Sequence, residues 1–213
     1  MTRAWLLLLG ALATVGFAAT VLVIIPRVML VRLTPPRELR PYSAVELRGR
    51  TVYIANGCVY CHSQQVRDPD FTTDVERGWG SRATVPADYV YDRPHLLGTM
   101  RTGPDLSNVG LRLPDTSWQL MHLYSPRAVA PWSIMPAFPF LFDVKDSSAL
   151  RPADRPVPVA SAHVPRGKVV VATPDALALV SYLLSLKHEY PVPAAAASER
   201  RAGAAGRSLH TMP

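Results

Sequence analysis

The first strong pattern in the chain is an uncharged apolar run near the N-terminus. From Ala4 to Ile25 the sequence is dominated by Leu, Val, Ala and Ile and carries no charge. At 1.5 Å per helical residue the run reaches ~33 Å, enough to cross the hydrocarbon core of a bilayer. A cleaved signal peptide is the alternative, since residues 16–18 form a weak small-x-small site, but its apolar part is usually shorter. We therefore expect a retained single-pass helix, within an anchor at residues 1–33.

The polar segment after this run contains a helix start that is visible in its capping residues. Ser43 and Glu46 form a capping box, in which the hydroxyl and the carboxylate accept hydrogen bonds from exposed amides. A helix is expected from about Ala44, with Gly57 as a left-handed stop. Its expected packing face is Val45, Gly49, Val52 and Tyr53.

Two further helices are indicated by their spacing and their ends. One runs from Asp115 to Tyr124 and is ended by Ser125-Pro126. The other begins at Thr173-Pro174-Asp175, where Thr can cap, Pro is tolerated in the first turn and Asp complements the helix dipole. The expected apolar face of this last helix is Leu177, Val180, Leu184 and either Tyr182 or Leu183.

The segments between these helices lack sustained periodicity. Residues 68–104 mix Pro, Gly, Asp and Arg and are expected to form loops. Residues 143–172 are Pro-rich and are expected to form a surface excursion, with one strand-like run at residues 169–171. We expect one domain at residues 34–190 and a disordered tail at residues 191–213.

Composition narrows the possible partners. The chain has 213 residues, is 48% hydrophobic and carries a formal charge of +7, but its Lys and Arg are scattered among 21 prolines. Without a dense basic stripe, nucleic-acid binding is not expected. The arginines that follow the apolar run either face a bilayer surface or an acidic partner, or are simply solvated.

The two cysteines belong to a single motif, Cys58-Val59-Tyr60-Cys61-His62. Two thiols at this spacing can add across the two vinyl groups of haem, with the following His placed beneath the iron. A zinc site would need further ligands from a chain with no other cysteine, and a redox dithiol would need a βαβ scaffold. The motif therefore predicts one covalently attached haem c.

A ligating His needs its second ring nitrogen hydrogen-bonded, because this fixes the tautomer and the orientation of the ring. The run from Arg101 to Leu106 contains a Gly-Pro turn, which presents the Pro104 carbonyl for this purpose. Arg101 itself either pairs with a haem propionate or is solvated.

The sixth iron ligand is expected to be Met135. Spacing alone leaves six soft or imidazole side chains open: Met100, Met121, Met135, His95, His122 and His163. Pro136 stiffens the loop that carries Met135, and Trp132, Phe138 and Phe140 could line the haem. Thioether ligation fills the coordination sphere, so the iron is expected to transfer electrons without binding oxygen.

Several short motifs together resemble the FixO family, the mono-haem subunit II of cbb3-type cytochrome c oxidases. They are Gly49-Arg50, Tyr53-Ile54, Gly57-Cys58, Cys61-His62-Ser63-Gln64, Tyr91-Asp92, the run from Arg101 to Leu106, Met135-Pro136-Ala137 and the run from Leu179 to Leu183. This resemblance implies a mainly α fold, with one N-terminal transmembrane helix and a class I cytochrome c domain with long loops. It also implies that Cys58 and Cys61 attach the haem and that His62 and Met135 ligate its iron.

By this resemblance the chain is a non-catalytic subunit that relays electrons to a haem-copper subunit, beside another c-type cytochrome. The excess of Arg after the apolar run favours a cytoplasmic domain. Haem attachment to this motif takes place outside the bacterial inner membrane, however, so we expect the domain in the periplasm. Two alternatives remain: an independent membrane-tethered cytochrome shuttle, and the small subunit of a related nitric oxide reductase.

Overall fold

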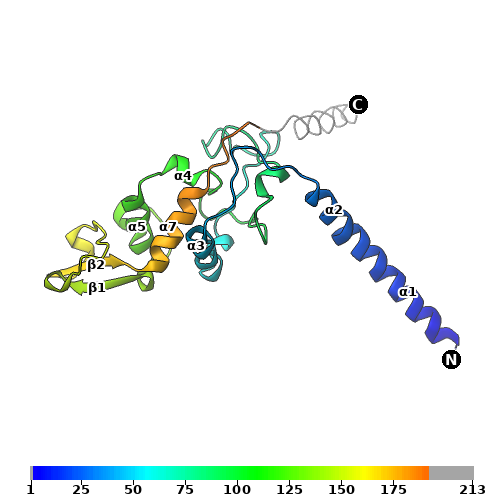
Figure 1. Ribbon diagram of the computed structural model, residues 1–213, viewed down its shortest axis with the longest axis horizontal. Helices are drawn as coiled ribbons and strands as arrows, with labels where there is room; N and C mark the ends of the chain where they lie inside the picture. The colour runs from blue at the N-terminus through cyan, green and yellow to red at the C-terminus, as the bar shows by residue number, and fades with distance from the viewer. Residues whose placement is uncertain (1, 192–213) are drawn as a thin grey trace. The chain divides into compact units, whose positions relative to one another are not determined.

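A computed structural model describes residues 2–191, and these residues form a mainly helical protein with one small sheet (Figure 1). They fall into two compact units. One contains residues 2–39, 85–92 and 190–191, and the other contains residues 40–84 and 93–189. The tail expected at residues 191–213 lies outside the described residues, except for Pro191.

The first unit begins with one long apolar helix. It consists of α1 (Thr2–Ala19), the π-helical η1 (Thr20–Ile24) and α2 (Ile25–Val31). The π segment ends two residues before Pro26, whose ring would clash with the carbonyl four residues back in a regular α-helix. Among the described residues, this is the single helix long and apolar enough to cross a membrane. The same unit contains the 3-10 helix η3 (Pro86–Tyr89).

In the second unit, α3 (Ala44–Ala55) starts where its capping box predicts. The Ser43 hydroxyl accepts from the Glu46 amide, and the Glu46 carboxylate accepts from the Ser43 amide. The expected packing face is correct for Gly49 and Tyr53, which are buried, but wrong for Val45, which is 55% exposed. Glu46 and Arg50 are buried in its place.

Helix α7 (Pro174–Ser185) lies alongside α3 (Figure 1). The two helices approach so closely that a Cβ at Gly49 would lie 1.8 Å from the Ala178 carbonyl oxygen. Tyr53 and Tyr182 pack edge to face across the contact, with ring centroids 5.6 Å apart. As expected, Thr173 caps α7. Its most buried face is Ala176, Ala178, Leu179, Val180, Tyr182 and Leu183, while Leu177 and Leu184 are half-buried.

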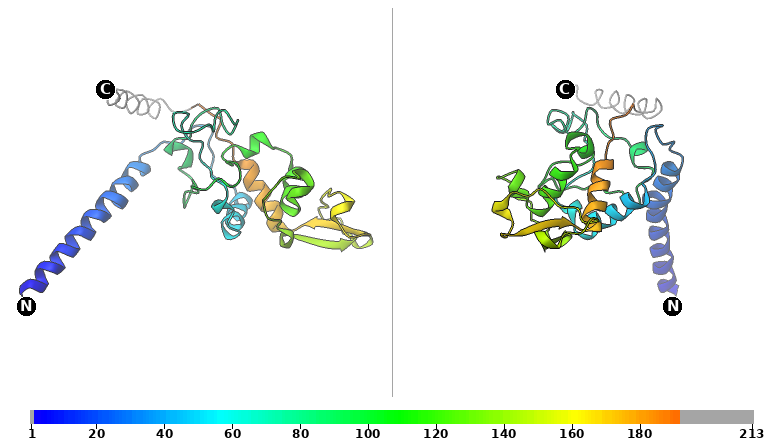
Figure 2. Two further views of the ribbon diagram at one scale, coloured as in Figure 1. Left: turned by 180° about the vertical axis from the view of Figure 1, so that it is seen from behind. Right: turned by 60° about the vertical axis from the view of Figure 1, so that its left-hand side comes forward.

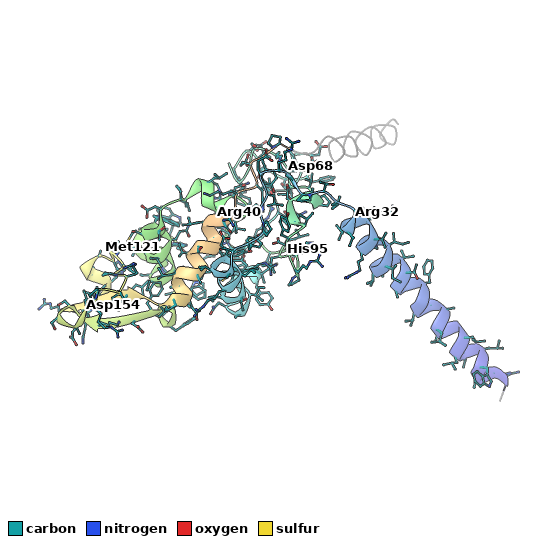
Figure 3. All side chains as sticks on the ribbon, viewed as in Figure 1. Arg32, Arg40, Asp68, His95, Met121 and Asp154 are labelled. Carbon is teal, nitrogen blue, oxygen red and sulfur yellow. The ribbon has the colours of Figure 1, made fainter. Side chains whose placement is uncertain are left out.

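Three shorter helices complete the helical part of this unit. They are α4 (Val109–Arg112), α5 (Thr116–Tyr124), which Asp115 caps, and α6 (Pro126–Val129). Met121 lies on α5 and packs partly buried against the core (Figure 3). The core takes its largest share from α7, with further apolar side chains from α3, α5, the two strands and the connecting loops.

A two-stranded antiparallel sheet projects from one end of this unit in both views (Figure 2). Strand β2 (Lys168–Ala172) contains the expected strand-like run, whereas its partner β1 (Phe142–Asp146) was not predicted. The register pairs Phe142 with Ala172. The segment between the strands is fastened by Asp154 (Figure 3), whose carboxylate accepts from Lys145 Nζ at 2.8 Å. The remaining short 3-10 helices are η2 (Cys58–Tyr60), η4 (Pro139–Leu141), η5 (Ser147–Ala149) and η6 (Ser161–His163).

Candidate haem site

The two cysteines and His62 lie on one tight turn directly after α3. Gly57 has a φ of 68°, a left-handed conformation that ends the helix and that glycine adopts without strain. The 3-10 helix η2 follows, and the His62 amide donates to the Cys58 carbonyl at 3.0 Å. Both cysteines are free thiols, with Cys61 exposed and Cys58 half-buried. Burial raises the pKa of Cys58 to about 11.

The imidazole of His62 is fixed by the turn that the sequence singled out. Its Nδ1 lies 2.8 Å from the Pro104 carbonyl oxygen. Because a carbonyl can only accept, Nδ1 carries the proton and Nε2 keeps its lone pair. Gly103 packs so tightly on the ring that a Cβ there would lie 2.3 Å from His62 Cε1. Burial also lowers the pKa of His62, which favours the neutral, ligating form of the ring.

The Gly-Pro turn is held in place by the buried carboxylate of Asp105. This carboxylate accepts from Ser63 Oγ at 2.6 Å, from the Gln65 amide at 2.7 Å and from the Ser107 amide at 2.8 Å. Ser63 directly follows His62, so the network joins the segment that carries the imidazole to the segment that carries the Pro104 carbonyl.

Arg101 belongs to the same network. Its Nε donates to Ser63 Oγ at 2.8 Å, its Nη2 donates to the Gln65 carbonyl at 2.6 Å, and its Nη1 pairs with Asp74. The guanidinium also lies 5.2 Å from the ring centroid of Trp79. Arg101 lines neither of the two cavities described below.

Two adjoining cavities border His62. The inner cavity has an empty volume of about 610 Å³ and the outer cavity about 880 Å³, and both volumes include space open to solvent. Residues that line both are His62, Pro104, Trp118, His122 and Met135. The inner cavity is lined in addition by Tyr53, Cys58, Leu106, Val109, Arg112, Leu113, Gln119, Leu123, Leu179 and Leu183. The outer cavity is lined in addition by Cys61, Thr102, Gly103, Ala130, Trp132, Ser133, Ile134 and Pro136.

Of the six side chains that sequence reasoning left open as the sixth ligand, Met135 and His122 line the cavities. Met100 is 58% exposed, and Met121 packs against the core. The other two, His95 and His163, are exposed and line neither cavity. The structure therefore brings together Cys58, Cys61, His62, Pro104 and Met135, five of the six residues predicted for the site.

The first 165 residues match the family model described as cytochrome c oxidase, mono-haem subunit/FixO. The chain belongs to the FixO family. A comparison with curated protein sequences gave no match. Membership of this family, together with the long apolar helix, makes the chain a membrane-anchored subunit of a cytochrome oxidase complex, and the family description implies one haem.

The cavities of this FixO chain fit a haem by the chemistry of their walls. The inner cavity is mainly apolar, as a porphyrin requires, and the chain supplies thiols, an imidazole and a thioether around the two cavities. Among residues 2–191, no group of three or more His, Cys, Asp or Glu side chains is arranged to hold a metal ion. Two buried nitrogen atoms on the cavity walls, Arg112 Nε and His122 Nδ1, have no hydrogen-bond partner within these residues.

Sequence reasoning missed two cavity residues of this FixO chain. Arg112 was not singled out, and His122 was considered only as an iron ligand. One local signal points to His122, which lies four residues after Trp118 on α5, so that the two side chains share a helix face. Arg112 carries no comparable signal, because its position on the cavity wall depends on contacts between distant segments.

Proposed function

We propose that this chain relays single electrons through one covalently held haem to the oxygen-reducing haem-copper subunit of a cbb3-type cytochrome c oxidase. The observation that supports this most strongly is the contact between His62 Nδ1 and the Pro104 carbonyl, on the wall of cavities that Cys58, Cys61 and Met135 also line. An imidazole held in this way presents Nε2 to an iron.

Each residue of the site has one proposed role. Cys58 and Cys61 would hold the haem covalently, each thiol by addition across one vinyl group, which needs no leaving group. His62 would donate an imidazole nitrogen and Met135 a thioether sulfur to the iron, and Pro104 orients the His62 ring. When bound, the haem supplies a one-electron iron couple. A filled coordination sphere leaves no open position for a substrate, so the chain acts as an electron relay and not as a catalytic subunit.

We further propose that the chain is anchored once in the bacterial inner membrane, with the haem domain in the periplasm. The anchor corresponds to residues 1–33 and the haem domain to residues 34–190, including the excursion at about 143–172. Covalent attachment of haem to a Cys-x-x-Cys-His motif takes place on the outer side of that membrane, and the motif at residues 58–62 therefore supports this orientation. The expected partners are the haem-copper subunit, another c-type cytochrome subunit and membrane lipid.

Purification of the full chain from its native membrane tests this proposal. We expect the intact mass of the chain to exceed the mass of the polypeptide by one haem. A paired Cys58→Ala and Cys61→Ala variant should lose that increment. The complex should contain a haem-copper subunit and reduce oxygen when supplied with a reduced donor.

Three outcomes would overturn parts of this proposal. Absence of the porphyrin mass from the wild-type chain would overturn it altogether. A haem-loaded chain isolated as a monomer from mildly solubilised membranes would overturn the subunit assignment in favour of a tethered shuttle. Reduction of nitric oxide in place of oxygen by the purified complex would overturn the oxidase assignment.

A further inference from the structure

Tyr182 on α7 places a phenol hydroxyl in the buried core between α3 and α7. Its side chain is fully buried, and its ring packs against the rings of Tyr42 and Tyr53, with centroids 5.6 Å away in both cases. Two aromatic contacts of this kind fix the orientation of the ring, and with it the direction of the hydroxyl. The hydroxyl donates a hydrogen bond to Gln64 Oε1 at 2.9 Å.

Gln64 belongs to the segment that carries His62, two residues before it. Its side chain is buried, and its amide donates to the Leu97 carbonyl at 2.8 Å. On the neighbouring residue, the Ser63 carbonyl accepts from the Leu106 amide at 2.8 Å. Backbone bonds to two separate turns therefore hold this segment, and the Gln64 side chain ties it to α7 as well.

The same helix also forms part of the inner cavity wall. Leu179 and Leu183 line that cavity, and Tyr182 lies between them in sequence. A buried hydrogen-bonded pair contributes little more to stability than apolar groups of the same shape, but it specifies one arrangement of its surroundings. The bond between Tyr182 and Gln64 is therefore suited to set where the His62 segment lies relative to the cavity.

We propose that Tyr182 and Gln64 are positioning residues for His62, and that their hydrogen bond keeps the His62 ring aligned with the Pro104 carbonyl. This inference rests on the proposed function, because it concerns the orientation of an iron ligand. A short bond from Nδ1–H to a carbonyl makes the other ring nitrogen a stronger donor to a metal. Loss of the Tyr182 hydroxyl should weaken the bond to Pro104, which favours ferrous iron and raises the reduction potential.

The test uses the haem-loaded full chain with Tyr182→Phe, which removes the hydroxyl and keeps the ring. Exchange of the His62 Nδ1 proton for deuterium, followed by NMR in the reduced state, should be about tenfold faster than in wild type. In a redox titration, the ferrous-to-ferric ratio at a fixed potential should rise about threefold, or about 30 mV for one electron. Unchanged exchange and potential would overturn the inference.

A double variant separates positioning of His62 from stability. Gln64→Leu removes the acceptor, and its combination with Tyr182→Phe removes donor and acceptor together, so the free energy of unfolding should recover towards that of wild type. The exchange of the His62 Nδ1 proton and the potential should stay altered, because the tie to α7 is still absent. Their return to wild-type values along with stability would show a purely structural bond and would overturn the inference.

Tyr124→Phe is the matched control. Tyr124 is half-buried, packs on Phe142 with centroids 5.4 Å apart and lines neither cavity, so its variant should keep wild-type exchange and potential. If Tyr182→Phe does not accumulate, Gln64→Asn decides in its place, since its amide is one methylene too short to meet the hydroxyl. An unaltered His62 signal in that variant has the same meaning. Failure of the proposed function is distinct, because it would appear as a wild-type chain without covalent haem.

Discussion

On the His62 side of the cavities, the ring is tied to the rest of the fold by bonds between segments far apart in sequence. The Pro104 carbonyl holds His62 Nδ1 at 2.8 Å, and Asp105 joins the Gly-Pro turn to the residues that follow His62. Arg101 adds a charge-assisted link to Asp74. Most of these groups are buried, so water does not compete for the bonds.

On the Met135 side, the loop is held mainly by short-range bonds. The Met135 amide donates to Ser133 Oγ at 3.2 Å, and the Ser133 amide donates to the Ala130 carbonyl at 2.8 Å. One longer-range bond joins the Phe138 amide to the Leu123 carbonyl at 2.9 Å. The apolar neighbours Trp132 and Ile134 are 83% and 72% exposed.

The two sides therefore differ in how much they stabilise the fold. On the His62 side, the buried groups that stabilise the fold also orient the imidazole. The Met135 side contributes little to folding, because few of its contacts are buried or reach distant segments. Changes on the His62 side should therefore cost stability, whereas changes on the Met135 side should alter the iron and leave most of the folding free energy intact.

Replacement of Asp105 by Asn should give the largest loss of stability. The substitution removes the charge that accepts from Ser63 and Gln65 and leaves their donors with a weaker acceptor in a buried site. We expect the free energy of unfolding to fall by about 3 kcal/mol. Denaturant unfolding of the haem-loaded chain, followed by circular dichroism, measures this loss.

Asp175→Asn is the control for Asp105. Asp175 pairs with Arg48 at the surface, where its side chain is 48% exposed, so we expect a change within about 0.5 kcal/mol. Equal losses in the two variants would contradict the view that the His62 side carries the stability.

Replacement of Met135 by Ala should change the iron more than the fold. Met135 is half-buried, so we expect a loss of about 1–2 kcal/mol. The reduced-minus-oxidised spectrum should lose its low-spin features, the reduction potential should fall and the reduced chain should bind carbon monoxide. Optical spectroscopy and a redox titration measure these changes.

Met121→Ala separates ligation from packing. Met121 packs against the hydrophobic core and lines neither cavity, so its loss should destabilise the fold without altering the spectrum. An unaltered spectrum in Met135→Ala, or an altered one in Met121→Ala, would refute Met135 as the ligand.

The parts of the fold that the sequence predicts are those with local causes. The start of α3 follows from Ser43 and Glu46, and the start of α7 from Thr173, because each cap lies within a few residues of the amide it binds. The hydrogen bond between His62 and Pro104 was also expected although the two residues are 42 positions apart, because a ligating His needs such a partner and the Gly-Pro turn offers a carbonyl.

The parts that the sequence does not predict depend on distant partners. Strand β1 forms against β2, which lies more than 20 residues away, and its own residues show no strand pattern. The ion pair between Arg101 and Asp74 was not expected, because nothing local marks a residue 27 positions away as the partner of Arg101. Val45 was expected to be buried, but the side of α3 that meets α7 is centred on Gly49 and Tyr53.

A smaller loss of unfolding free energy is expected when the Glu46 cap is changed. The hydrogen bonds of Glu46 are local, whereas those of Asp105 join distant segments. The Arg40 guanidinium, together with the Ser43 amide at 2.7 Å, lowers the pKa of Glu46 from 4.5 to about 2. Because this pKa is lowered in the folded chain, the carboxylate stabilises the fold fully above pH 4.5, and this contribution is lost as the pH falls towards 2. Glu46→Gln should cost about 1 kcal/mol at pH 7.

The free energy of unfolding, measured between pH 7 and pH 3, tests this in wild type, Glu46→Gln and the control Glu38→Gln. Glu38 is exposed, so its replacement should leave the curve unchanged. The curves of wild type and Glu46→Gln should converge as the pH falls. Protonation of Glu46 in wild type removes the negative charge that the substitution has already removed in the variant. Parallel curves would mean that the Glu46 charge is not what stabilises the start of α3, and that the hydroxyl of Ser43 caps the helix by itself.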